Sequence, residues 1–119
     1  MKTRFAGLVA VSMLAAIAVA APLRADEAAA KQNYTTFCAK CHGATGKGDG
    51  EGAATLKTKP RDFADCTRMA SITDDTMFNV IKNGGPAAGL SADMTAWKAG
   101  LEDAEIKDLI AYIRKFCKK

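Results

Sequence analysis

The stretch Cys38-Ala39-Lys40-Cys41-His42 constrains this chain more than any other part of the sequence. Two thiols that are separated by two residues and followed at once by a histidine are typical of covalent c-type haem attachment. Each thiol can form a thioether bond with one vinyl group of the haem, and the histidine that follows can bind the iron. Five consecutive residues therefore predict both the covalent tether and one axial ligand.

A CxxC pair has two other common uses, which the rest of the sequence does not favour. Thioredoxin-like redox pairs belong to a βαβ context, and zinc sites need a second pair of ligands. The chain has no strand-period segment, and His42 is its only histidine. Haem attachment is the leading interpretation, and a redox or chance CxxC is the alternative.

The N-terminus has the layout of a secretory signal peptide. Lys2 and Arg4 precede an apolar run over residues 5–21, which is shorter than the roughly 20 residues needed to span a bilayer. Cleavage fits after Ala20 or after Ala25, and we prefer Ala25. The sequence thus predicts a signal peptide over 1–25 and an exported, periplasmic domain over 26–119, with an uncleaved anchor as the alternative.

The basic character of the chain comes mainly from this N-terminal segment. The formal net charge is +4, and residues 1–25 contain three basic residues and no acidic ones. The remaining domain is close to neutral and lacks the clustered basic face of a nucleic-acid-binding protein. We expect a monomer that binds no nucleic acid and does not insert into the membrane after cleavage.

Apolar residues recur at helical spacing in three segments, which predicts an all-α domain. Thr73 is a good N-cap for the second segment, and Gly84-Gly85-Pro86 is expected to end it. The three helices are predicted over Asp26–Phe37, from Thr73 to Gly84, and over Asp103–Phe116.

The segments between these helices carry turn chemistry. Five glycines lie within residues 43–52, where we expect the backbone to wrap closely around a flat ligand. Residues 57–65 and 87–100 are expected to be irregular. Arg61 is a candidate donor to a haem propionate, although a solvated surface arginine is equally compatible with the sequence.

A methionine is the expected second axial ligand, because a chain with one histidine cannot supply two. Met77 falls on the apolar stripe of the second helix, where methionine more often serves packing. Met94 lies in a loop that can carry its thioether over the haem. We prefer Met94 as the distal ligand, with Met69 second and an open site or a lysine third.

Together these features resemble a class I cytochrome c of the small bacterial periplasmic monohaem type. The resemblance rests on Tyr34 four residues before the first haem cysteine, the CAKCH motif, the glycine-rich loop, KPRDF, NGGP, Met94 and a C-terminal LIAYI helix. It implies three to four helices wrapped around one covalently bound haem c. It also implies that the first and last helices cross through Ala30, Tyr34, Leu109 and Tyr112.

The remaining two cysteines, Cys66 and Cys117, are expected to pair. An exported protein reaches an oxidising compartment, where spare thiols commonly form disulfides. Two free thiols or an intermolecular disulfide are the alternatives.

The predicted function is soluble one-electron transfer between redox partner proteins, and no catalytic set of side chains is evident. Scattered lysines could surround the haem edge and steer an acidic partner, or simply be solvated surface. The alternative is a haem enzyme or gas sensor with an open sixth coordination site. A subunit of a larger respiratory or dehydrogenase complex would use the same chemistry with a fixed partner.

Overall fold

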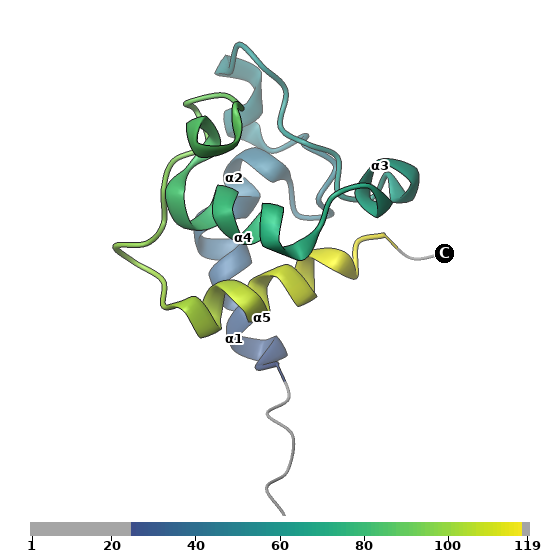
Figure 1. Ribbon diagram of the computed structural model, residues 1–119. Helices are drawn as coiled ribbons and strands as arrows, with labels where there is room; N and C mark the ends of the chain where they lie inside the picture. The colour runs from purple at the N-terminus through teal and green to yellow at the C-terminus, as the bar shows by residue number, and fades with distance from the viewer. Residues whose placement is uncertain (1–24, 118–119) are drawn as a thin grey trace, which may run out of the picture.

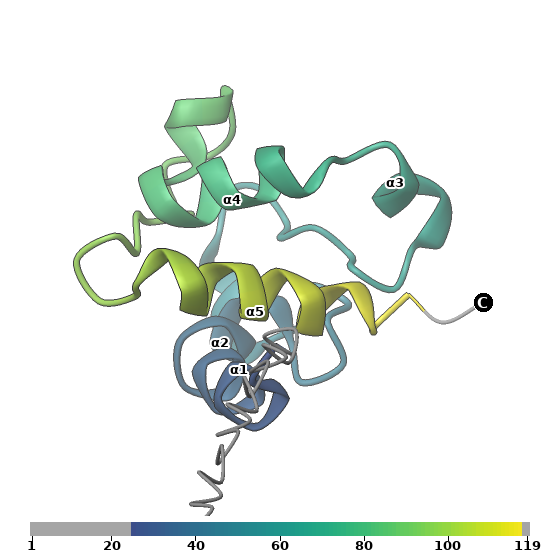
Figure 2. The same cartoon turned by 60° about the horizontal axis from the view of Figure 1, so that its bottom comes forward.

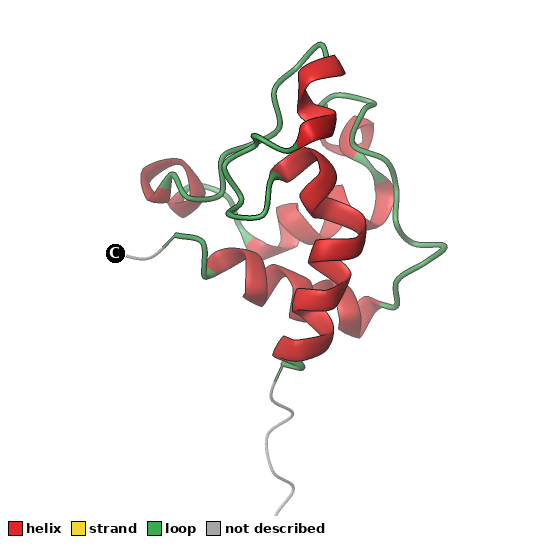
Figure 3. Cartoon of the chain, turned by 180° about the vertical axis from the view of Figure 1, so that it is seen from behind, coloured by secondary structure: helices red, strands yellow, loops and turns green. Residues whose placement is uncertain are grey.

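The computed structural model describes residues 25–117 of the chain. This part consists of helices joined by loops and contains no strand (Figure 3), so the predicted all-α fold is confirmed. None of its helices is long and apolar enough to cross a bilayer. Apart from Ala25, the predicted signal peptide lies outside the described residues, and its cleavage site stays a prediction.

Short helical turns accompany five α-helices in the described part of the chain. The order is α1 (Glu27–Asn33), the π-helical turn η1 (Tyr34–Cys38), α2 (Ala39–His42), the 3₁₀ turn η2 (Glu51–Thr55), α3 (Cys66–Ala70), α4 (Asp74–Asn83), the 3₁₀ turn η3 (Gly85–Ala88) and α5 (Asp103–Arg114).

The first three elements form one helical rod that ends at the CxxCH motif (Figure 3). Its start is fixed by the Asp26 carboxylate, which accepts a hydrogen bond from the Ala29 amide at 3.0 Å. The predicted end at Phe37 was too early, because η1 carries the helix on to His42. Gly43, with φ of +81°, then turns the chain away.

The ends of α4 agree with their sequence signals. The Thr73 hydroxyl accepts a hydrogen bond from the Thr76 amide at 3.1 Å, and Gly84 follows the last helical residue with φ of +87°. The last helix, α5, begins at Asp103 as predicted, with Glu102 and Glu105 forming a capping box, but it ends at Arg114.

The core lies where the N-terminal rod crosses α5 (Figure 1). Ala30, Tyr34 and Leu109 are buried at this crossing, as the resemblance implied, and the rings of Tyr34 and Tyr112 lie 5.5 Å apart. On the other side of α5, α4 runs beside it (Figure 2), and Lys82 of α4 pairs with Asp103 at 2.7 Å.

The C-terminal end of α5 holds α3 in place (Figure 2). The Arg114 guanidinium donates to the Met69 carbonyl oxygen at 2.7 Å and to the Ile72 carbonyl oxygen, and it pairs with Asp74 at 2.7 Å. The sulfur atoms of Cys66 and Cys117 lie 2.05 Å apart, and their Cα atoms lie 5.0 Å apart. These contacts attach residues 66–74 to the C-terminal end of α5.

Candidate functional site

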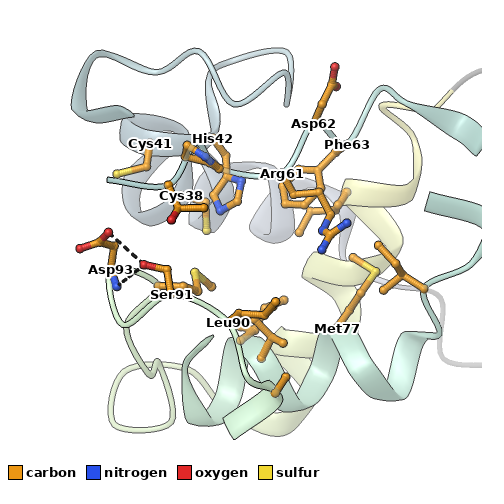
Figure 4. Close-up of a pocket in the computed structure, with 18 of the residues that line it drawn as sticks. Cys38, Cys41, His42, Arg61, Asp62, Phe63, Met77, Leu90, Ser91 and Asp93 are labelled. Carbon is orange, nitrogen blue, oxygen red and sulfur yellow. Dashed lines mark hydrogen bonds between the residues drawn. The ribbon is translucent and has the colours of Figure 1, made fainter. Parts of the chain in front are cut away.

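Cys38, Cys41 and His42 of the motif lie in the wall of a cavity of about 610 Å³, a size typical of small-molecule and cofactor sites (Figure 4). Residues from η1, α2, α3, α4, α5 and the loops between them contribute to this wall, whereas α1 and η2 do not. The side chains that define it are Phe37, Cys38, Cys41 and His42 from the first rod, Arg61 and Phe63, Met69 and Ile72, Met77 and Ile81 from α4, Leu90, Met94 and Trp97, and Ile113 from α5.

The two motif cysteines face the cavity from the end of the rod. Cys38 and Cys41 are half-buried and form no disulfide. Their spacing of three residues across the junction of η1 and α2 puts them on neighbouring turns of one helix face. Burial, followed by the neighbouring Cys41, raises the pKa of the Cys38 thiol to about 12. A redox-active CxxC pair needs a lowered thiol pKa instead, so the raised pKa of Cys38 disfavours the redox alternative.

His42 is the last residue of α2, and its ring points into the cavity (Figure 4). Burial lowers its pKa below the usual range, while a backbone group of Arg61 acts in the opposite direction. The imidazole is therefore held in the neutral form, which is the form that binds metals. Its buried Nδ1 has no hydrogen-bond partner in the described part of the chain, so the Arg61 backbone lies near it without hydrogen-bond geometry.

The glycine-rich loop does not wrap the cavity, and that expectation was wrong. None of its glycines belongs to the cavity wall. A Cβ on Gly50 would lie 2.2 Å from the Lys40 carbonyl oxygen, and one on Gly48 would lie 2.4 Å from the Pro60 carbonyl oxygen. The glycines instead let the loop pack directly on the backbone of α2 and on the backbone of Pro60 and Arg61.

Arg61 lies in the cavity wall, half-buried, and its side chain makes no hydrogen bond or ion pair with the described residues. Figure 4 shows its guanidinium projecting toward the cavity. Lys59 and Arg68 line the same cavity. An unpaired guanidinium at an apolar wall is suited to bind a carboxylate of a cofactor.

All three candidate methionines line the cavity. Met69 and Met77 are core residues, 2% and 7% exposed, on α3 and α4. Met94 lies in the loop before α5, where Ser91 and Asp93 face His42 across the cavity (Figure 4). The amide of Gly85 donates to the Met94 carbonyl oxygen at 2.8 Å, so this loop is fixed on the turn that ends α4.

Several residues of the site had no signal of their own in the sequence. Phe63 stacks on His42, with ring centroids 4.5 Å apart and an interplanar angle of 13°. Phe37 and Leu90, the large apolar side chains that are exposed in the described part, both line the cavity. The KPRDF pattern marked a segment of the cavity wall, but only the folded chain shows that Phe63 of this segment meets His42.

The residues present fit a covalently bound haem. Two free thiols on neighbouring turns, a neutral histidine with an unsatisfied buried nitrogen, a thioether and an unpaired guanidinium surround one apolar cavity. The described residues contain no group of three or more His, Cys, Asp or Glu side chains that could hold a metal ion by themselves. The fold and the site thus define a c-type cytochrome domain.

Comparison with known proteins agrees with this class. Residues 25–113, more than half of the chain, match the family described as cytochrome c oxidase, cbb3-type, subunit III. The chain belongs to this family. Membership of this family implies a covalently bound haem c and supports a haem-based electron carrier. The resemblance to the class I cytochromes c is confirmed.

Solved structures show the same relationship. The chain is similar to a protein described as KustC0563 c-type cytochrome, with 29% sequence identity and a TM-score of 0.60, over 75% of this chain and 98% of that one. It shares its fold with a chain of the Kuenenia stuttgartiensis reducing HAO-like protein complex Kustc0457/Kustc0458, at 24% identity and a TM-score of 0.60. That match covers 74% of this chain and 41% of the other. No curated protein sequence matches the chain.

Proposed function

We propose that this chain is a periplasmic one-electron carrier that holds a single haem c, with His42 and Met94 as axial ligands. The observation that carries the proposal is the cavity itself. It brings together the two thiols of the motif, the only histidine of the chain and a loop methionine, within apolar walls. When bound, the haem supplies a reversible ferric/ferrous couple.

The side chains of the site have separate tasks in this proposal. The thiols of Cys38 and Cys41 form the thioether tethers, and His42 donates its imidazole from the end of the same helix. Met94 is preferred over Met69 and Met77 because those two are built into the core, whereas the loop of Met94 faces His42. Arg61 is proposed to donate to a propionate.

Transfer would occur at the open side of the cavity, between redox partner proteins. Phe37 and Leu90 line the cavity and are 39% and 44% exposed, so they contribute apolar surface beside the predicted haem edge. The protein described with the HAO-like complex shows that this fold also occurs within an assembly. A monomeric carrier and a subunit with a fixed partner would share the same site.

Optical spectroscopy of the purified, haem-loaded protein tests the ligand set. We expect a Met-to-iron charge-transfer band in the ferric protein and no carbon monoxide binding in the reduced protein. Met94→Leu should abolish the band and open the reduced iron to carbon monoxide, because it removes the thioether at nearly constant volume.

Two matched variants act as controls, since their residues line the same cavity. Met69→Leu and Met77→Leu should keep the band. Loss of the band in Met69→Leu would assign the ligand to Met69 and refute the role of Met94. Ready carbon monoxide binding by the wild type would instead favour an open-site haem enzyme or gas sensor.

A further inference from the structure

We propose that Phe63 is the positioning residue for the axial histidine, and that it fixes the plane of the His42 ring by stacking on its face. The inference rests on the proposed ligation of haem iron by His42. The two rings are nearly parallel, at 13°, and their centroids lie 4.5 Å apart. This separation is at the close end of the range for stacked aromatic rings.

A hydrogen bond of normal geometry does not provide this restraint among the described residues. A histidine that binds a metal usually donates its second ring nitrogen to a carbonyl or carboxylate, which sets the orientation of the ring. The buried Nδ1 of His42 makes no hydrogen bond within normal distance and angle limits, although the backbone of Arg61 interacts with the ring as a hydrogen-bonding group. Stacking on Phe63 thus adds a restraint on rotation of the ring about its Cβ–Cγ bond, beside the interaction with the Arg61 backbone.

Phe63 is itself held firmly enough to act as a template. Its amide donates to the Gly46 carbonyl oxygen at 2.7 Å, and its side chain is buried. A Cβ on Gly46 would lie 3.2 Å from the Cβ of Phe63 and 2.8 Å from the ring of Phe116. The glycine-rich loop therefore packs tightly, at Gly46, against both Phe63 and the C-terminal turn.

The next residue is fixed too, because the Asp62 carboxylate accepts a hydrogen bond from the Ala64 amide at 2.8 Å. The backbone on both sides of Phe63 is thereby restrained. Burial of the stacked pair also keeps water from the Nδ1 side of the imidazole. The apolar shell around a metal ligand tunes its redox potential, so the same ring influences both ligand orientation and the polarity around the ligand.

The test compares ferric EPR spectra of the haem-loaded full chain. The low-field g value depends on the orientation of the axial ligands, and its line width depends on how uniform that orientation is. Phe63→Leu should shift this line and broaden it, since it keeps an apolar side chain but removes the stacked ring. Phe63→Tyr, which retains a ring, should keep the wild-type position and width.

Phe78→Leu is the matched control, because Phe78 packs against the core and is not part of the cavity wall. It should leave the line unchanged. An unchanged line in Phe63→Leu, or an equal shift in Phe78→Leu, would overturn the proposal.

A measurement on the wild type does not depend on whether Phe63→Leu matures. In the reduced, diamagnetic protein, NMR should show nuclear Overhauser contacts between the ring protons of Phe63 and those of His42. Their absence overturns the stacking. Failure of the proposed function has a different signature, because a wild-type protein without a low-spin, His-ligated haem spectrum would refute the ligation itself.

Discussion

The hydroxyl of Tyr34 connects the helical rod to the chain just after the CxxCH motif. Tyr34 is buried, and it donates a hydrogen bond to the Gly43 carbonyl oxygen at 2.8 Å. The same oxygen accepts the Gly46 amide at 3.1 Å, so it keeps one partner without the tyrosine. The tyrosine hydroxyl thus stabilises the position where the chain leaves His42.

Tyr34→Phe should lower the free energy of unfolding by about 1 kcal/mol, the usual net contribution of one hydrogen bond. Denaturant unfolding of the haem-loaded protein measures this change. Tyr112→Phe is the control, because the Tyr112 hydroxyl makes no hydrogen bond with the described residues. Equal losses in the two variants would contradict the role of the Tyr34 hydrogen bond.

The buried hydroxyl of Tyr34 also predicts a dependence of stability on pH. Burial raises the pKa of the Tyr34 hydroxyl above its usual range, whereas in the unfolded chain this hydroxyl ionises at about pH 10. Above that pH the folded state binds one more proton than the unfolded state, so this group makes stability fall as pH rises. Below it the contribution is constant, and Tyr34→Phe should lack this alkaline loss.

Single residues also show what could be inferred from the sequence and what could not. Cys38, Cys41 and His42 are neighbours along one helix, so their spacing alone predicted that they act together. Phe63 meets His42 only through the loop that joins them, and no local pattern encodes that contact. The sequence therefore indicated that the three motif residues belong to one site, but not that Phe63 stacks on one of them.

At the scale of elements, the long helices were predictable and the short ones were not. Caps and apolar periodicity located the start and end of α4 and the start of α5. The five-residue helices η2 and α3 were missed, because elements this short are stabilised by tertiary contacts rather than by their own sequence. Contacts of Arg114 with the end of α3 are an example.

The turn after α4 positions the loop that carries the proposed distal ligand. A Cβ on Gly85 would lie 2.0 Å from the Ser91 carbonyl oxygen, which in turn accepts the Met94 amide at 3.2 Å. Any side chain at position 85 must therefore displace the backbone that leads to Met94. Gly84 and Gly85 were predicted to end α4, and the structure shows that Gly85 also lets the loop of Met94 pack closely on this turn.

Gly85→Ala should weaken the Met-to-iron band and increase carbon monoxide binding, because Met94 no longer reaches its position in every molecule. Gly89→Ala is a matched control in the same turn. It introduces a left-handed strain of roughly 1–2 kcal/mol, but a Cβ at position 89 has nothing within 4 Å. A full wild-type band in Gly85→Ala would show that the loop tolerates displacement.

For the whole molecule, the C-terminal end of α5 connects regions that are distant in the sequence. Arg114 donates to the carbonyl oxygens of Met69 in α3 and of Ile72 after it. Phe116 packs over Gly46 of the glycine-rich loop, and Cys117 lies at bonding distance from Cys66. Met69 and Ile72, in the segment held by Arg114, form part of the cavity wall. Residues 114–117 thus hold one side of the cavity in place.

The Cys66–Cys117 disulfide is predicted to form in the exported protein and to stabilise it. The two cysteines are 51 residues apart, so on the chain-entropy model their bond contributes about 4 kcal/mol by restricting the unfolded chain. The double variant Cys66→Ser/Cys117→Ser should lose about that much free energy of unfolding. It should keep its haem, because the thioether tethers involve other cysteines.

A reductant separates loss of the bond from loss of packing. It should destabilise the wild type toward the level of the double variant and leave the variant unchanged, since haem thioethers resist thiol exchange. Mass spectrometry after alkylation without reduction should find no modified cysteine in the wild-type monomer. Two alkylated thiols there would show that the chain folds without the bridge, and the closure of the cavity wall would then depend on Arg114 and Phe116.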